Sequence, residues 1–285
     1  MKNLEIYCVT DKPITFLENF NYQLCGVGDN KFSEKYLRCD THNNIYNKEK
    51  YYSELAFHYW YWKNKLDINN KNWIGFCQKR RFWINKDSVG EKITLNNFHE
   101  HFLETVPNEW NSYESILCNP IKVNEVKISK LLKRGIRSVI KNPSLLINKN
   151  KRNIKLHFDM HHGHGNLNKA IEVMDKTDRY DFDKFVNNST EFNPHIIFIS
   201  KSEIANKWFK NLYDWLFKCE KIFGFKDLHG YDTNRLYAYL AERYLSFWFN
   251  KYTKVLNWPW VLFDPEKKDR LSKMKLFSEL NSNKF

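Results

Sequence analysis

The order of apolar segments in the first 84 residues constrains the fold more than any other feature of this sequence. "LEIYCVT" (residues 4–10) and "YQLCGVG" (residues 22–28) are short apolar runs typical of buried strands. From about Lys50 to Leu66, apolar residues recur at helical spacing without a helix breaker, and "NWIGFCQKRRFWI" (residues 72–84) is again typical of a strand. The order strand, strand, helix, strand predicts an α/β fold in which helices cover a sheet.

The second half of the chain continues this pattern. "PHIIFIS" (residues 194–200) predicts a buried strand, and residues 201–224 predict a long amphipathic helix that stops at Gly224. Residues 166–188 predict one or two helices, and residues 234–252 predict a strongly apolar helix. No internal repeat and no Gly/Ser-rich linker marks a boundary between domains. We therefore expect a single domain over residues 1–263, followed by a charged tail over residues 264–285.

The excess of positive charge favours an anionic partner. Lys and Arg outnumber Asp and Glu by 46 to 33, a net charge of +13. Nucleic acid, a phosphorylated donor or an anionic membrane surface would each suit this charge, although a biased base composition also enriches a chain in Lys and Asn. The basic, partly amphipathic segment from Lys127 to Arg152 is either a solvated face or a site of peripheral contact with the inner membrane.

Cysteine usage and hydropathy indicate the compartment. The six cysteines are scattered without a C-x-x-C pair, which favours reduced thiols over a disulfide framework or a zinc ribbon. The first residues do not resemble a signal peptide, and no segment approaches the roughly 18 apolar residues of a membrane span. We expect a cytoplasmic protein, attached at most to the cytoplasmic face of the membrane.

A run of polar residues at the end of a predicted strand is a candidate ligand site. Gln78, Lys79, Arg80 and Arg81 follow the apolar part of residues 72–84. Ligands of open α/β sheets bind at the carboxyl ends of strands, and two adjacent arginines there can clamp phosphates by bidentate hydrogen bonds. The alternative is an exposed basic turn.

The stretch "HFDMHHGHG" (residues 157–165) holds the residue types that zinc prefers. A metal site here would use His157, Asp159 and His161. No H-E-x-x-H motif accompanies them, so an acid–base centre or a polar loop remains open.

Charged residues also lie on the predicted helices. Glu54 stands near the start of the helix over residues 50–66, where an acid is expected in any protein. Arg235 and Glu242 are seven residues apart and share a helix face. With Asp232 and Arg243 they form either a structural ion-pair network or part of a catalytic site.

Several of these segments together resemble one family. "YYSELAFHYWYWKN" followed by "WIGFCQKRRFW" resembles the S/C-E-L-T-x-x-Y-W-x-W-K-N helix and "IGLCHYRRYF" strand of the family catalogued as domain of unknown function 4422. "IYCVTDK", "GVGDN", the pair His161–His162, "IFISKSE…YDWLF" and "RLYAYLAERYLSFWF" extend the resemblance from about residue 4 to 260, with a diverged, helix-rich insertion at about 84–154. Gln78 and Lys79 replace a His-Tyr pair of the family, Asp11 replaces a histidine, and no D-x-D motif follows a predicted strand.

The resemblance implies a GT-A-like glycosyltransferase with a mostly parallel central sheet and a helical C-terminal part, of the kind found with bacterial capsule and lipopolysaccharide biosynthesis. It implies a UDP- or GDP-linked sugar donor, a glycan or lipid-linked acceptor and, in many such enzymes, Mn²⁺ or Mg²⁺; no nucleic acid is expected. A departing diphosphate needs fixed cations or a metal ion, and an inverting transfer needs a base. The candidate catalytic residues are Asp159, His161, His162 and Glu242. The candidate donor-binding residues are Thr10, Asp11, Lys12, Gly28, Glu54, Lys63, Gln78, Arg80, Arg81 and Arg235.

Two other functions remain open from the residues alone. A metal-dependent hydrolase would use the cluster from His157 to His164. A basic nucleic-acid-binding protein would use the net charge and the aromatic residues, although no nucleic-acid-binding motif is present.

Overall fold

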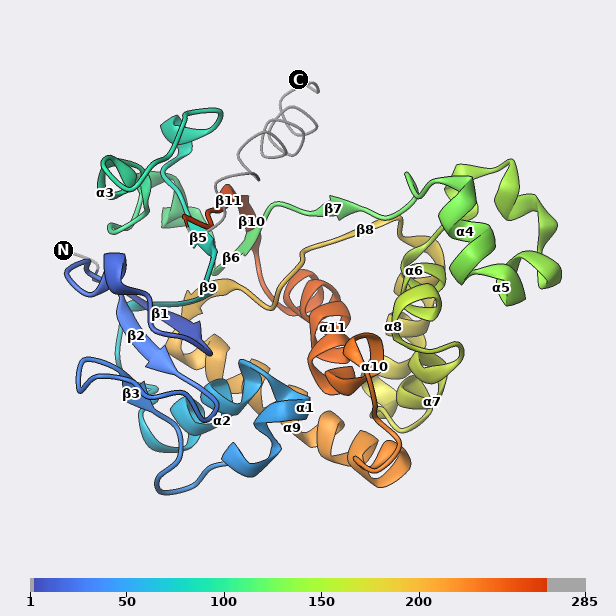
Figure 1. Cartoon of the computed structure of the whole chain (residues 1–285), viewed down its shortest axis with the longest axis horizontal. Coiled ribbons are helices and arrows are strands. Elements are labelled where there is room, and N and C mark those ends of the chain that lie inside the picture. The colour runs from blue at the N-terminus through green and yellow to red at the C-terminus, as the bar shows by residue number, and fades with distance from the viewer. Residues whose placement is uncertain (1–2, 266–285) are drawn as a thin grey trace.

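A nine-stranded sheet organises the chain in the computed structural model, which describes residues 3–265 (Figure 1). Its main path runs in the order β10-β6-β9-β4-β1-β2-β3. These strands are β1 (Leu4–Thr10), β2 (Gln23–Gly26), β3 (Leu37–Arg38), β4 (Trp73–Gln78), β6 (Ser115–Cys118), β9 (Phe198–Lys201) and β10 (Val255–Trp258). All neighbours on this path are parallel except at β9, which runs antiparallel to both β4 and β6. The predicted mostly parallel α/β sheet is therefore confirmed.

Four further strands lie beside this path. β5 (Arg81–Trp83) pairs antiparallel with β4 and with β11 (Trp260–Leu262). β7 (Ile121–Lys122) and β8 (Glu191–Phe192) form a separate two-stranded sheet.

Three long helices pack on one face of the sheet: α2 (Leu55–Asn64), α9 (Ser202–Phe223) and α11 (Leu236–Tyr252). A fourth, α8 (Lys176–Asn188), packs against α11 instead. Shorter helices are α1 (Glu49–Tyr52), α3 (Phe98–His101), α4 (Ile128–Arg134), α5 (Ile136–Lys141), α6 (Ile154–His162), α7 (Asn166–Glu172) and α10 (Tyr231–Asn234). Single 3-10 turns occur at Thr15–Leu17, Tyr46–Lys48, Lys86–Ser88, Asn108–Ser112, Pro143–Leu146 and Lys149–Lys151.

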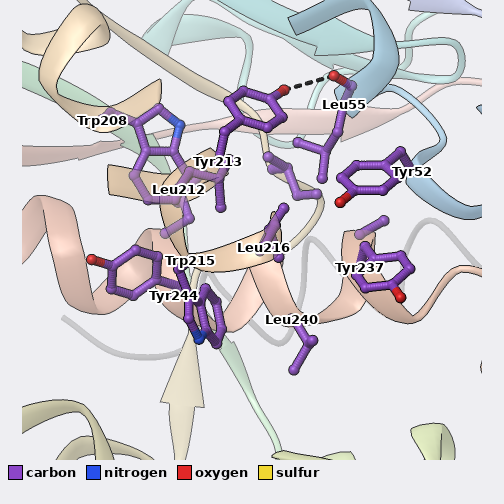
Figure 2. Packing of buried hydrophobic residues seen from close by; sticks show 14 of the residues in the cluster. Tyr52, Leu55, Trp208, Leu212, Tyr213, Trp215, Leu216, Tyr237, Leu240 and Tyr244 are labelled. Atoms are coloured by element: carbon purple, nitrogen blue, oxygen red, sulfur yellow. Dashed lines mark hydrogen bonds between the residues drawn. The ribbon is translucent and has the colours of Figure 1, made fainter. Parts of the chain in front are cut away.

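Successive side chains along the strands point to opposite faces of the sheet, so the hydrophobic core has two parts. Tyr7 and Val9 of β1 face the helices, whereas Ile6 and Cys8 face the loops of residues 14–22 and 82–110. Both faces of β1 are therefore buried, as is usual for a parallel sheet. On the helical side α9 and α11 interdigitate through aromatic and leucine side chains, and the Tyr213 hydroxyl donates to the Leu55 carbonyl at 2.6 Å (Figure 2).

The strands over residues 4–10 and 22–28 and the helices over residues 201–224 and 234–252 are confirmed. Residues 166–188 form two helices, α7 and α8. The helix expected from Lys50 to Leu66 is divided at Ser53, whose φ of 54° lies outside the helical region. The strand expected over residues 72–84 reverses at Lys79–Arg80 into β5.

Two other expectations need correction. Residues 84–154 are not only a helix-rich insertion, because they supply β6, which lies between β10 and β9 in the sheet. The histidine-rich stretch is not a loop: His157 to His162 lie on α6, and only His164 follows the helix. Within residues 3–265 no helix is long and apolar enough to cross a membrane.

Candidate active site

The carboxyl ends of three adjacent parallel strands bring the first candidate residues together. Val9 of β1 pairs with Gln78 of β4, and Thr10 pairs with Gly26 of β2, so these strands end side by side. Asp11 and Lys79, the first residues after β1 and β4, form an ion pair. Burial acts to raise the pKa of Asp11, but the hydrogen bond and charge of Lys79 outweigh it and lower that pKa. An ionised acid and a fixed cation therefore stand at the sheet edge, and exposed Lys12 follows them.

Gly28 shapes the loop after β2. Its φ of 73° is a left-handed conformation that glycine adopts without strain. The Gly28 carbonyl accepts hydrogen bonds from Arg38 Nη2 at 3.0 Å and from the Tyr46 hydroxyl at 2.9 Å. The backbone at this edge is thereby held in place beside Thr10, whose carbonyl accepts from the Val27 N–H at 2.9 Å.

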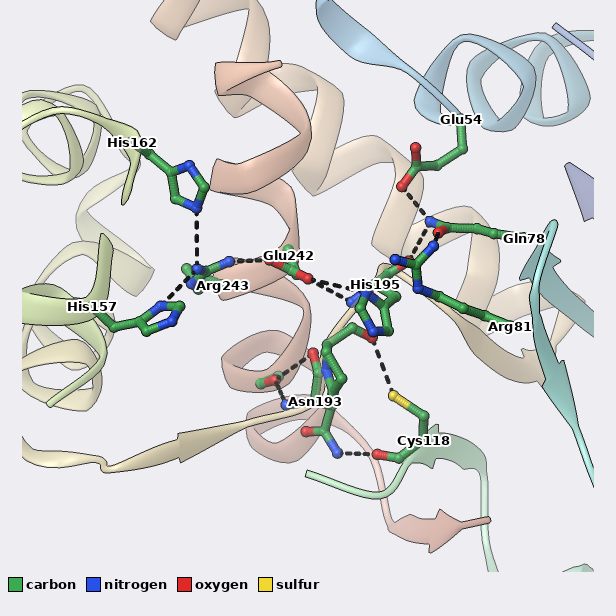
Figure 3. A network of polar contacts seen from close by, with 12 residues as sticks. Glu54, Gln78, Arg81, Cys118, His157, His162, Asn193, His195, Glu242 and Arg243 are labelled. Atoms are coloured by element: carbon green, nitrogen blue, oxygen red, sulfur yellow. Dashed lines mark hydrogen bonds and ion pairs between the residues drawn. The ribbon is translucent and has the colours of Figure 1, made fainter. Parts of the chain in front are cut away.

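Gln78 joins this edge to a polar network deeper in the molecule (Figure 3). Its Nε2 donates to Glu54 Oε1 and, at 2.5 Å, to the carbonyl of His195. Its Oε1 accepts from Arg81 Nη1 at 3.3 Å. Burial raises the pKa of Glu54, which moves this carboxyl toward the range useful for proton transfer.

Glu242 continues the network from α11. Its Oε1 accepts from the His195 backbone N–H at 2.6 Å, and its Oε2 pairs with Arg243. The Arg243 side chain is 1% exposed and also contacts His157 Nδ1 at 3.1 Å and His162 Nε2 at 3.5 Å. Polar contacts thus run without interruption from Glu54 beside the sheet, across α11, to the histidines of α6 (Figure 3).

The histidines of α6 are held by protein partners and are weak bases. Burial, with the charges of Lys130 and Arg134, lowers the pKa of His161 to about 4, and burial with the charge of Arg243 lowers that of His162 to about 2. The His162 ring stacks on Tyr239 with centroids 3.7 Å apart. General bases work best with a pKa near the operating pH, so these imidazoles are poorly tuned for that role.

Asp159 lies apart from the other candidates. Its carboxylate accepts from the Gly165 N–H at 3.0 Å and lies 3.3 Å from His164 Nδ1, so it stabilises the turn after α6. Among residues 3–265, no three His, Cys, Asp or Glu side chains are placed to hold a metal ion. The interpretation of His157, Asp159 and His161 as a metal site is therefore not supported, and neither is a metal-dependent hydrolase built on it.

The predicted cations occupy different places. Arg80 pairs with Asp264 at 3.2 Å, whereas Arg81 contacts Gln78, so the two adjacent arginines do not share a partner in these contacts. Arg235 is exposed at the start of α11, and its charge acts on Asp11, Glu49 and Glu54.

Lys63 lies outside this group. It stands nine residues after Glu54 along α2, roughly 13 Å at the helical rise. Its ammonium group covers the Trp62 ring at 3.4 Å.

Backbone strain concentrates around this network. Five non-glycine residues in the part of the chain described here have positive φ, and four of them, Ser53, Arg80, His195 and Ile196, adjoin or belong to it. Such conformations cost on the order of 1–3 kcal/mol each and persist where the surrounding structure enforces them, commonly at functional sites.

Sequence reasoning did not identify His195 as part of the site. Only Pro194 before a buried strand marks it. The backbone groups of His195 bind Gln78 and Glu242, and its imidazole Nδ1 lies 3.8 Å from Glu242 Oε1. Arg243 was recognised as a charge on an apolar helix, and the structure shows the buried partners that such a charge requires.

The comparisons with known proteins agree with this architecture. The fold is similar to the structure described as the WbbM bifunctional glycosyltransferase in its apo form, with a TM-score of 0.69 and 18% sequence identity. The likeness covers 92% of this chain and 46% of that one, so the present chain spans less than half of that protein. No curated protein matches the sequence. The predicted GT-A-like fold is thus confirmed.

A family model described as a domain of unknown function, DUF4422, matches residues 5–254. This match covers the helices, all strands except β10 and β11, and every part of the network except the contact of Arg80 with Asp264. The chain therefore belongs to the DUF4422 family.

Proposed function

We propose that the protein is a glycosyltransferase that takes its sugar from a nucleotide-sugar donor bound at the carboxyl edge of β2, β1 and β4. The observation that carries this proposal is the meeting of Gly28, Asp11, Lys12 and Gln78 at that edge. Open α/β sheets bind ligands at this position. The fold shared with a glycosyltransferase supports the same reaction class.

Fixed cations would stabilise the leaving group. When the bond between the sugar and the donor diphosphate breaks, negative charge grows on the diphosphate oxygens, and preorganised cations lower the barrier most there. Lys12 and Arg235 are exposed, and Lys79, which follows Gln78 in the sequence, pairs with Asp11. A Mn²⁺ or Mg²⁺ ion would supply the same charge, but no three His, Cys, Asp or Glu side chains among the described residues are placed to hold one.

Glu242 is our candidate for the base that accepts the proton of the acceptor hydroxyl. Among the four predicted catalytic residues, Asp159 lies outside the polar network, at the turn after α6, and both histidines have pKa values far below neutrality. Glu242 lies at the centre of the polar network, with its carboxylate oriented by His195 and Arg243. A single base without a protein nucleophile corresponds to an inverting transfer.

The remaining features of the proposal come from the family resemblance and the residues. The donor is a UDP- or GDP-linked sugar, and the acceptor is a glycan or lipid-linked glycan of the capsular or lipopolysaccharide type. Cysteine burial supports a cytoplasmic enzyme, because all six thiols are free and buried.

Donor binding can be tested by calorimetric titration of the full chain with UDP, GDP, CDP and CMP, each with and without Mn²⁺. One nucleoside diphosphate should bind, and Lys12→Gln or Arg235→Gln should weaken it about tenfold, as expected for one lost charge-assisted contact. Lys63→Gln is the matched control, since it removes a lysine outside the network and should leave affinity unchanged.

Two results would refute the donor site. One is the absence of binding by any of the nucleotides, and the other is an equal loss of affinity in the Lys12, Arg235 and Lys63 variants. The role of Glu242 is tested separately by Glu242→Gln, which should lower kcat at least a hundredfold while the nucleotide Kd stays the same. A fall in affinity with kcat preserved would exclude Glu242 as the base.

A further inference from the structure

Residues 127–152 form a small lobe with its own core at the edge of the molecule (Figure 1). The lobe contains α4, α5 and the two 3-10 turns that follow them. Leu131, Val139 and Leu145 pack against Leu156 and Met160 of α6, in a cluster separate from the two main cores. The lobe is therefore attached through α6 and presents its other side to solvent.

Large aliphatic side chains are concentrated on that outer side. Five of the eleven large hydrophobic residues found exposed within residues 3–265 lie here: Ile128 (51%), Leu132 (44%), Ile136 (45%), Ile140 (72%) and Ile147 (89%). Ile128 and Leu132 are four residues apart on α4, as are Ile136 and Ile140 on α5, so each pair lies on one side of its helix. Exposed aliphatic residues gathered in this way mark an interaction surface, whereas single exposed hydrophobic residues scattered over a surface need no explanation.

Positive charges surround these aliphatic side chains. Residues 127–152 contain no Asp or Glu and nine basic residues: Lys127, Lys130, Lys133, Arg134, Arg137, Lys141, Lys149, Lys151 and Arg152. Arg152 is buried and donates to backbone carbonyls, so it belongs to the lobe's interior. The lysines at 127, 130, 133 and 141 are exposed on the same two helices as the isoleucines or directly before them.

We propose that this face docks on a membrane surface that carries anionic lipids. Aliphatic side chains flanked by Lys and Arg are the combination that interfacial helices use: the apolar groups enter the headgroup–acyl boundary and the cations bind anionic headgroups. The proposal concerns the solvent side of the lobe rather than the sheet edge and does not depend on the proposed enzymatic function.

Other occupants fit the charge or the shape less well. The C-terminal residues 266–285 carry six basic and three acidic residues, so their net charge repels the lobe. A second copy of the same positively charged face would repel it as well. Nucleic acid would be attracted by the charge, but residues 127–152 contain no aromatic residue for base stacking, and exposed isoleucines add nothing to phosphate binding.

The test is co-sedimentation of the full chain with phosphatidylcholine vesicles, with and without phosphatidylglycerol. One variant, Ile140→Ser with Ile147→Ser, removes aliphatic groups, and a second, Lys130→Gln with Lys133→Gln and Lys141→Gln, removes charge. The matched controls change side chains of the same kind elsewhere on the surface: Val89→Ser with Ile222→Ser, and Lys92→Gln with Lys176→Gln and Lys184→Gln.

We expect binding to the anionic vesicles, and a loss of partitioning of at least about tenfold in each lobe variant, with the controls unchanged. Circular dichroism of every variant checks that the fold is retained. The proposal is overturned if the wild-type chain does not bind anionic vesicles, or if lobe variants and controls bind alike. It is also overturned if the lobe variants alter only self-association or oligonucleotide binding while vesicle binding persists.

Discussion

The buried guanidinium of Arg243 offers the sharpest test of the network, through the substitution Arg243→Met. Met keeps much of the aliphatic volume that packs against Phe192, whose ring lies 4.2 Å from the guanidinium carbon. The substitution removes the partner of Glu242 Oε2 and the contacts to His157 and His162. The fold should survive, because the packing is kept while the charge is lost.

The size of the effect follows from burial. Removing one member of a buried ion pair costs about 3–5 kcal/mol, because the other charge is left uncompensated. The Glu242 side chain is 14% exposed and keeps the His195 N–H as a donor, so the lower end applies. We expect the free energy of unfolding to fall by about 3 kcal/mol, which for a chain of this size lowers Tm by roughly 5 °C.

Urea denaturation at pH 7 measures this loss, and a double-mutant cycle with Glu242→Gln assigns it. In the double variant no buried charge lacks a partner. Its loss of stability should therefore be smaller than the sum of the two single losses by about 1–3 kcal/mol. A loss below about 1 kcal/mol for Arg243→Met, or additive effects in the cycle, would refute the description of this pair as a buried, coupled contact.

Three further predictions concern stability. Burial and neighbouring positive charges hold the pKa of His161 near 4 and that of His162 near 2, below the ordinary value near 6.5, so the folded state resists protonation. The contribution of these neutral histidines to the free energy of unfolding should therefore be complete above pH 6.5 and should decrease as the pH falls toward 4. A urea midpoint that stays constant between pH 6.5 and 5 would contradict this. His58 is 1% exposed, burial lowers its pKa to about 3, and its Nδ1 has no hydrogen-bond partner within the described part of the chain. His58→Phe should therefore stabilise the protein by about 1 kcal/mol at pH 5. A loss of stability in calorimetry would show that the larger phenyl ring does not fit this site. Glu220 accepts from Lys48 at 2.7 Å and from the Tyr52 hydroxyl at 2.7 Å, so Glu220→Gln should cost about 1 kcal/mol in urea denaturation, and the cost should shrink in Lys48→Gln.

Local periodicity was sufficient to predict the main elements. The burial of both faces of residues 4–10 and the long apolar stripe of residues 201–224 are encoded in neighbouring residues, and β1 and α9 formed where expected. The family was predicted from the resemblance of sequence motifs rather than from periodicity, and these motifs lie on β1, α2, β4, α9 and α11. Periodicity also placed Thr10, Asp11, Lys12 and Gln78 at strand ends, where a parallel sheet brings them together.

Elements whose conformation depends on distant partners were not predicted. The break at Ser53 and the reversal at Arg80 use positive φ values that no local pattern of these residues indicates. The helical state of His157 to His162 was missed because histidines in sequence suggested a ligand cluster, whereas Phe158 of this helix packs in the main core and Met160 in the small core of the lobe.

The sequence by itself therefore determined the class of fold, the family and the set of residues from which a site can be built. Only the tertiary structure decided which of them act together: it joined Gln78 to the His195 carbonyl, 117 residues away, and left Lys63 and Asp159 with other partners. The physical reason is that secondary structure follows from the spacing of apolar residues over a few turns. The partner of a buried charge, in contrast, is fixed only when sheet and helices pack and each desolvated polar group must be satisfied.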